Sequence, residues 1–234
     1  MRGLALAQAG SPVCPQASGV DGIRPLHQSM DEICEAYLGE LRAHHPGGPY
    51  LLAGYSNGGL IAYELAQRLT AAGEPVAAVT LLDTIHPAFA ESRIPLRTHL
   101  FELRRKGPRY ALERVRERRQ RAARHAADAV LDRYVDRPGT PAPWEVRERR
   151  LFVHNKALLA RYRPVGYAGR VVMMSATDDW KYRHLPADRG WSAVVPHIEV
   201  VRTPGDHVTL LEGANADVLA GGLRPVLERI LGEA

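Results

Sequence analysis

Residues 54–58 read Gly-Tyr-Ser-Asn-Gly and join two stretches of very different pattern. Residues 50–54 form a short apolar run that is typical of a buried strand, whereas residues 60–69 have the spacing of a helix, which Gly73 closes. A tight turn from strand to helix holds its central residue, Ser56, in a strained backbone conformation and pushes the hydroxyl into the open. The pattern therefore predicts an α/β fold with a serine presented at the end of a buried strand.

Strands and helices alternate along most of the chain. Residues 28–45 are predicted to form a helix that begins with a capping box of Ser29 and Glu32. Three further apolar runs are predicted to be buried strands and a last amphipathic stretch a helix, namely 76–82, 170–176, 197–203 and about 215–231. Buried strands that alternate with helices imply a mostly parallel sheet with helices on both faces.

Residues 86–168 interrupt this alternation. They are polar, rich in arginine and helical in propensity, so we interpret them as a helical lid insertion over the functional edge of the sheet, within a single domain of residues 1–234. Residues 102–124 hold ten Arg or Lys against three Glu, although the whole chain has a net charge of only +5. This stretch could attract an acidic partner or could simply be a solvated lid helix.

The composition narrows the class of protein. With 45% hydrophobic and 24% charged residues, the chain has the composition of an ordinary globular protein. Its excess of positive charge is confined to one stretch, whereas a nucleic-acid-binding protein is expected to be basic more evenly. No apolar run approaches the about 20 residues of a membrane helix, and residues 1–15 do not resemble a signal peptide. Cys14 and Cys34 lie in no metal-binding pattern. We therefore expect a cytoplasmic protein without a metal, a membrane or a nucleic acid as partner.

The setting of Ser56 is that of a catalytic nucleophile. Glycine is expected at positions 54 and 58 because side chains there would collide with the neighbouring strand and helix. The backbone amide of Asn57 lies at the start of the helix and can donate to a developing oxyanion. The alternative is an inert serine in a glycine-rich turn.

A serine nucleophile needs a base within hydrogen-bond reach. His207 follows the strand 197–203 through a Pro-Gly-Asp turn, at the end of the strand where parallel sheets place their sites. The six other histidines downstream of Ser56 lie in the insertion or at strand starts and are interpreted as solvated or structural: His86, His99, His125, His154, His184 and His197. His207 is therefore the predicted base.

The base in turn needs a carboxylate to orient it, and the residues alone leave two places open. Asp83 ends the strand that follows the nucleophile helix, whereas Asp178 and Asp179 follow the next strand. Either place can reach His207. Asp206 is adjacent to His207 and more plausibly caps the turn.

Six blocks of the sequence resemble the thioesterase domains that release products from nonribosomal peptide and polyketide synthases. The blocks are Gly48–Gly59, Ala62–Glu64, Leu81–Asp83, Tyr162–Pro164, Tyr167–Val171 and Pro204–His207. They stand in the family's order. The resemblance implies an α/β-hydrolase fold with a lid, and it places the acid on Asp83. Stand-alone editing thioesterases place the acid one strand later, which keeps Asp178 and Asp179 as the alternative.

The resemblance also implies a reaction. An acyl or peptidyl chain would arrive as a thioester on the phosphopantetheine arm of a carrier domain, pass to Ser56 and leave by hydrolysis or cyclisation, in secondary-metabolite biosynthesis. No cofactor of the enzyme's own is implied. The alternatives are a carboxylesterase or lipase of the same fold and an inactive relic that only binds the carrier.

The chain departs from the family's pattern at its start. The family begins with a strand, a His-Pro-Gly-Gly-like turn that supplies a second oxyanion amide, and a helix, but residues 12–22 already resemble the segment after that helix. The resemblance therefore implies an N-terminally short domain. Residues 3–7 could form a makeshift strand or the tail of the family's first helix, and we expect the helix.

Overall fold

The computed structural model describes residues 5–6, 15, 17–19, 21, 24–90, 93–135 and 143–233. A five-stranded sheet of order β1-β2-β3-β4-β5 forms the centre. Four of its strands run parallel: Tyr50–Tyr55 (β2), Val76–Leu82 (β3), Val171–Ala176 (β4) and Ile198–Thr203 (β5). These strands lie where the apolar runs predicted them. Parallel strands bring their carboxyl ends to one edge, so the residues after β2, β3 and β5 meet there.

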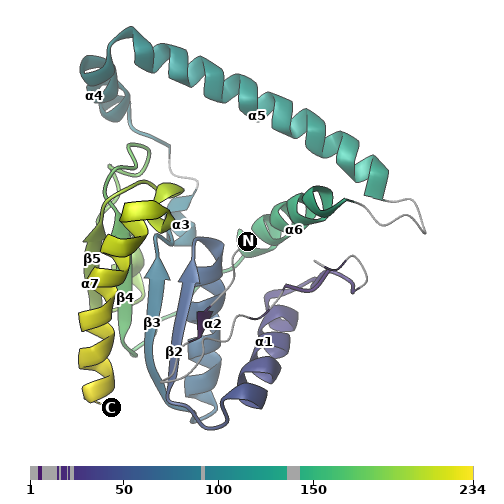
Figure 1. The fold of residues 1–234 in the computed structure, drawn as a ribbon, viewed down its shortest axis with the longest axis vertical. Coiled ribbons are helices and arrows are strands. Elements are labelled where there is room, and N and C mark those ends of the chain that lie inside the picture. Colours follow the sequence, from purple (N-terminus) through teal and green to yellow (C-terminus); the bar gives the residue numbers. More distant parts are fainter. Residues whose placement is uncertain are drawn as a thin grey trace.

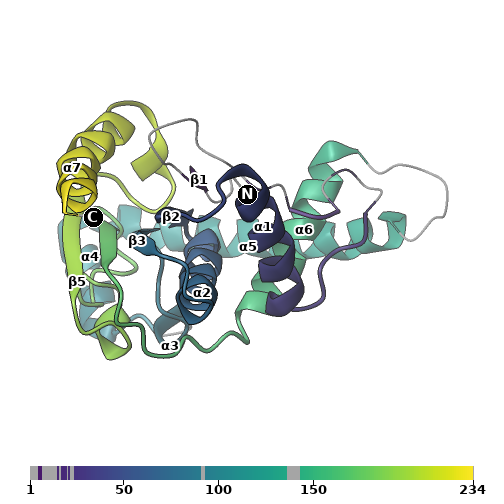
Figure 2. The same cartoon turned by 90° about the horizontal axis from the view of Figure 1, so that it is seen from below.

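Helices cover both faces of the sheet (Figures 1 and 2). Met30–His44 (α1), Asn57–Ala71 (α2) and Trp144–Leu159 (α6) contribute to an apolar core on one face, and Gly213–Gly232 (α7) packs on the other. The sheet with helices on both faces is the α/β-hydrolase arrangement that the sequence predicted.

Local signals explain where the helices begin and end. Ser29 Oγ accepts a hydrogen bond from the Glu32 amide at 3.1 Å, as the predicted capping box requires, and Glu32 reaches back to the amide of Gln28. At the C-terminal end of α2, Gly73 adopts a φ of +76°, a conformation that favours glycine and that ends the helix.

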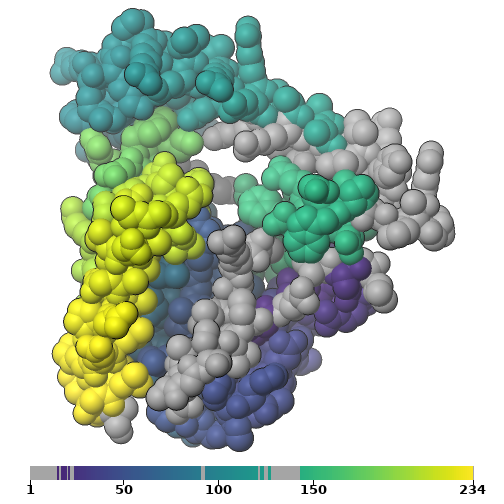
Figure 3. Space-filling view, viewed as in Figure 1, coloured from purple at the N-terminus to yellow at the C-terminus, as the bar shows by residue number. Residues whose placement is uncertain are grey.

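The insertion between β3 and β4 is helical, as expected. It contains Pro87–Ala90 (α3), Leu96–Lys106 (α4), Pro108–Val135 (α5) and α6. Figure 1 places α4 and α5 above the carboxyl ends of the strands, and the space-filling view in Figure 3 shows an opening between α5 and the rest of the molecule.

The lid helices rest on the loop that follows β4. The ring of Trp180 in this loop lies edge-on to Tyr110, at 5.4 Å between ring centroids, and beneath the guanidinium of Arg114 at 5.2 Å. Two ion pairs join the same elements: Lys181 with Glu117 at 3.5 Å, and Arg183 with Glu102 at 3.8 Å. The position of the lid is therefore tied to the loop of residues 177–190.

The start of the chain contradicts one expectation. Ala5–Leu6 (β1) pairs antiparallel with β2, opposite Ala53 and Leu52, so these residues form a short strand and not the tail of a helix. An unpaired strand edge presents free backbone donors and acceptors, and β1 satisfies part of that edge of β2. None of the helices in the described ranges is long and apolar enough to cross a membrane.

Candidate active site

Ser56 occupies the turn between β2 and α2 in a strained conformation. Its φ is +54° and its ψ is −124°, which a residue other than glycine rarely adopts. Hydrogen bonds hold the turn on both sides: the Ser56 amide donates to the carbonyl of Leu82 at 3.0 Å, and Thr84 Oγ1 donates to the carbonyl of Ser56 at 2.9 Å. Such strain persists only where surrounding contacts enforce it.

The glycines of the turn differ in how much space a side chain would have at their positions. A Cβ added at Gly54 would lie 2.2 Å from the carbonyl oxygen of Gly58, so the expected collision is present there. A Cβ at Gly58, in contrast, would meet no atom within 4 Å, and the expectation of a collision at this position was wrong. The close approach is made one residue later, where a Cβ on Gly59 would lie 2.0 Å from Thr84 Oγ1.

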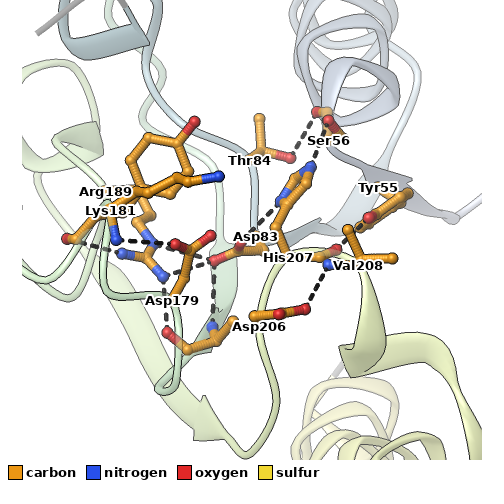
Figure 4. A network of polar contacts seen from close by, with 12 residues as sticks. Tyr55, Ser56, Asp83, Thr84, Asp179, Lys181, Arg189, Asp206, His207 and Val208 are labelled. Atoms are coloured by element: carbon orange, nitrogen blue, oxygen red, sulfur yellow. Dashed lines mark hydrogen bonds and ion pairs between the residues drawn. The ribbon is translucent and has the colours of Figure 1, made fainter. Parts of the chain in front are cut away.

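Ser56, His207 and Asp83 form a continuous line of hydrogen bonds (Figure 4). His207 Nε2 lies 3.0 Å from Ser56 Oγ, and His207 Nδ1 lies 2.8 Å from Asp83 Oδ2. The three residues come from the ends of β2 and β3 and from the turn after β5. Such a line allows the imidazole to accept the hydroxyl proton while the carboxylate holds the ring.

Asp83 is completely buried, and its second oxygen is also bound. Oδ1 accepts a hydrogen bond from the amide of Ala176 at 3.1 Å and another from Arg189 Nε at 3.0 Å. Burial alone would raise the pKa of Asp83, but the hydrogen bond from His207 and the charge of Arg189 outweigh it, so this pKa lies below its ordinary value. Asp83 therefore stays ionised beside His207.

The alternative carboxylates make other contacts. Asp178 Oδ2 accepts from the amide of Gly205 at 2.8 Å, and Asp179 Oδ1 accepts from the amide of Lys181 at 3.0 Å. Asp206 caps the turn as expected, because its Oδ1 accepts from the amides of Val208 and Thr209. The carboxylate that the structure brings to His207 Nδ1 is that of Asp83.

Two contact residues escaped the sequence reasoning. The ring of Tyr55 stacks on His207 at 5.0 Å between centroids, and its hydroxyl donates to the His207 carbonyl. Burial raises the pKa of Tyr55 to about 12, so the hydroxyl keeps its proton for this bond. Tyr55 lies inside the motif and could have been noticed there. Arg189 lies in an irregular loop, where no periodicity or motif marks it.

Other reactive side chains lie apart from this line. Cys34 is buried, which raises the pKa of its thiol to about 12, and Cys14 lies outside the described residues. His86 is buried edge-on against Trp191 at 5.3 Å between centroids. Among the described residues, no group of three or more His, Cys, Asp or Glu is arranged to hold a metal ion. Asn57, the predicted oxyanion donor, is the first residue of α2, where backbone N–H groups lack helical partners.

A strained serine between a parallel strand and a helix, beside a histidine and a buried aspartate, defines an α/β-hydrolase. The helical insertion after the strand that carries the aspartate narrows the choice within this class. The sequence model of the thioesterase domain family matches residues 6–226, and the chain belongs to that family.

The similar curated proteins are large synthases. The chain is 30% identical over 193 residues to the non-reducing polyketide synthase atnG of an Arthrinium species, and 28% identical over 201 residues to enterobactin synthase component F of Escherichia coli. These matches cover 78% and 86% of this chain. They span only 9% and 14% of the relatives, so this chain is similar to one domain of each.

Solved structures agree with this assignment. The NocB thioesterase domain from the nocardicin cluster superposes with a TM-score of 0.62 at 26% identity, over 90% of this chain and 78% of that one. A four-domain nonribosomal peptide synthetase shares the fold, with a TM-score of 0.59 over 89% of this chain and 16% of its own, at 21% identity. The protein is thus a thioesterase domain of the synthase type, in the class of hydrolases that act on thioesters.

Proposed function

We propose that the chain releases an acyl or peptidyl group from a carrier-bound thioester, with Ser56, His207 and Asp83 as its catalytic triad. The observation that carries the proposal is the hydrogen-bonded line from Ser56 Oγ through the imidazole to a buried, ionised carboxylate. The strained backbone of Ser56 supports it, since that strain presents the hydroxyl at the carboxyl edge of the sheet.

In the first half-reaction, His207 Nε2 takes the proton of Ser56 Oγ while the oxygen attacks the thioester carbonyl. The negative charge passes to the carbonyl oxygen, where the amide of Asn57 at the start of α2 donates to it. The C–S bond then breaks, His207 returns the proton to the sulfur, and the acyl group remains on Ser56. Asp83 stabilises the charged imidazole throughout.

In the second half-reaction, His207 removes a proton from a new nucleophile, which attacks the acyl-serine. A water molecule gives a free acid, and a hydroxyl or amine of the product itself gives a ring. Ser56 Oγ leaves and recovers its proton from His207. The acyl chain and the choice between hydrolysis and cyclisation depend on the space beneath the lid.

Relatives support both the mechanism and the substrate class. The NocB thioesterase domain has been solved as a covalent complex with a fluorophosphonate analogue of nocardicin G, at 26% identity to this chain. Fluorophosphonates phosphonylate activated serines, because the serine oxygen attacks phosphorus and displaces fluoride, so a matching adduct on Ser56 would be consistent with the proposal. The similarity to synthases makes a carrier domain bearing phosphopantetheine the proposed partner.

The test compares thioester and oxygen-ester substrates that carry the same acyl group. We expect a higher kcat/KM for the N-acetylcysteamine thioester than for the ethyl ester, and a further rise for the thioester on a carrier domain. Ser56→Ala should abolish all three activities. Preference for the ethyl ester would instead indicate a carboxylesterase or lipase. A protein that binds the carrier without turnover or probe labelling would be an inactive carrier-binding relic.

A further inference from the structure

The side chain of Arg189 is nearly inaccessible and contacts Asp83 from the side opposite His207 (Figure 4). Its Nε and Nη2 lie 3.0 and 2.9 Å from Asp83 Oδ1. The guanidinium also donates from Nη2 to the carbonyl of Ala176 at 2.7 Å and from Nη1 to the carbonyl of Tyr182 at 3.2 Å. All three of its nitrogens are therefore fixed, at the end of β4 and in the loop that follows it.

The backbone holds Arg189 as firmly as the side chain. Its φ is +54°, a strained conformation for arginine, and its carbonyl accepts a hydrogen bond from the amide of His86 at 3.1 Å. The amide of Arg189 donates to the carbonyl of Pro186 at 3.0 Å. Strain of this kind persists where the surrounding structure requires a residue in one place.

The two oxygens of Asp83 consequently have separate partners. Oδ1 is bound by Arg189 and by the amide of Ala176, which leaves Oδ2 for His207. A carboxylate without the first set of contacts could rotate or share both oxygens with the imidazole. The contacts at Oδ1 therefore determine the direction from which Oδ2 meets the ring.

Arg189 also compensates the buried charge. Other ionisable groups surround the pair: Asp179 and Lys181 in the loop after β4, Asp206 and His207 after β5, and Tyr55 on β2. Burial and the charge of Asp83 raise the pKa of Asp179, which shows that the surroundings disfavour further negative charge. Without Arg189, the field of Asp83 would act on the imidazole unopposed and favour its protonated form, which cannot act as a base.

We propose that Arg189 is a positioning residue for the reaction: it orients Asp83 through Oδ1 and balances the charge that Asp83 presents to His207. The inference rests on the proposed triad. Arg189 acts through Asp83 and does not touch the reacting atoms. Replacing it should change the rate of the chemical step and its pH dependence, with little effect on substrate binding.

The experiment compares Arg189→Gln, Arg189→Lys and the unchanged protein on one N-acetylcysteamine thioester. Active sites are counted with a fluorophosphonate, so that kcat refers to folded, reactive protein. Arg68→Gln is the matched control, because Arg68 pairs with Asp31 and with Glu64 at 2.8 Å but lies three turns along α2 from Ser56. Melting temperatures are recorded for all four proteins.

For Arg189→Gln we expect kcat per active site to fall by about tenfold to a hundredfold with KM nearly unchanged, as for other residues that orient a functional side chain. The acid limb of the kcat/KM profile should move to higher pH, because the positive charge of Arg189 no longer offsets the charge of Asp83 beside the imidazole. Arg189→Lys keeps the charge without the planar fork. In Arg189→Lys, the acid limb should return to the pH of the unchanged protein, but kcat should stay below that of the unchanged protein. Arg68→Gln should change neither quantity.

A purely structural role gives a different result. The melting temperature and the number of active sites would fall, whereas kcat per site and the acid limb would match the unchanged protein, and that outcome would overturn the proposal. If Arg189→Gln does not fold, the test rests on Arg189→Lys. An undiminished kcat per site in Arg189→Lys would contradict the proposal that the planar guanidinium orients Asp83. Failure of the triad itself is distinguishable, because Ser56→Ala and Asp83→Asn would then remain active.

Discussion

At the scale of single residues, burial and partners distinguish the carboxylates around His207. Asp83 has no exposed surface, and its carboxylate accepts hydrogen bonds from His207, Arg189 and the amide of Ala176. Asp178 and Asp206, in contrast, accept from backbone amides and hold turns. A buried carboxylate with a lowered pKa can hold the imidazole in one tautomer and stabilise its charge. The contacts of each carboxylate, and not its distance along the chain, therefore make Asp83 the proposed acid.

Asp83→Asn tests this assignment. An amide in place of the carboxylate favours the wrong imidazole tautomer, which in serine proteases lowers kcat on the order of 10⁴-fold. We expect a loss of this size in steady-state hydrolysis of an acyl thioester. Asp178→Asn and Asp179→Asn serve as controls and should lose far less. A severe loss in either of these, with Asp83→Asn active, would place the acid after β4.

The residues of the site also differ in how far the sequence predicts them. Ser56, His207 and Asp83 follow strands whose apolar runs are plain, so topology brings them to one edge. The position of Arg189 depends on the path of a loop in which Arg189 and Gly190 both have positive φ. Neither hydrophobic periodicity nor secondary-structure propensity predicts the path of that loop. Its contact with Asp83 joins residues 106 positions apart and becomes evident only in three dimensions.

At the scale of elements, the turn between β2 and α2 shows how tertiary contacts correct local expectations. The apolar spacing of a helix is plain only over residues 60–69, whereas α2 begins at Asn57, the residue whose amide was expected at the start of the helix. Packing there overrides the low helix propensity of Gly58 and Gly59. The pairing of β1 with β2 was likewise not the expected outcome. A two-residue strand has almost no local signal, and only the neighbouring edge makes it a strand.

Alanine at Gly58 and at Gly59 should have opposite effects. At Gly59 the new methyl group would press on the buried Thr84, and overpacking of this kind costs about 1–3 kcal/mol. At Gly58 the methyl group meets open space, and alanine should stabilise the helix by up to about 1 kcal/mol. Urea unfolding of the two variants measures the difference. Equal losses at both positions would show that a methyl group at Gly58 also meets a close neighbour.

At the scale of the whole molecule, the lid connects the outer surface with the active site. Four arginines of α5 are exposed, namely Arg109, Arg116, Arg118 and Arg119. Arg114 and Lys181, in contrast, face Trp180 at the base of the lid. Substrate enters beneath α4 and α5 if it reaches Ser56 from the carboxyl edge of the sheet (Figure 1). A carrier domain would then approach the lid and its positive charge.

Reversing charge on the lid tests this approach. Arg118→Glu with Arg119→Glu should lower kcat/KM for an acyl carrier substrate by roughly tenfold at low salt, since complementary charge speeds encounter. The effect should shrink at high salt, and a free N-acetylcysteamine thioester should be unaffected. Arg202→Glu with Arg224→Glu gives the same change in charge at exposed positions on β5 and α7, outside the lid helices, and is the control. Equal losses with both substrates would indicate damage to the lid and not a docking defect.

The most direct test of the proposed mechanism is the position of a covalent adduct. The protein is treated with a fluorophosphonate, digested and mapped by mass spectrometry while residual thioester hydrolysis is followed. We predict one adduct, on the peptide that contains Ser56, with turnover lost in proportion to labelling and no adduct on Ser56→Ala. Labelling of a different serine, or full turnover by protein labelled at Ser56, would contradict the assignment of Ser56 as the nucleophile.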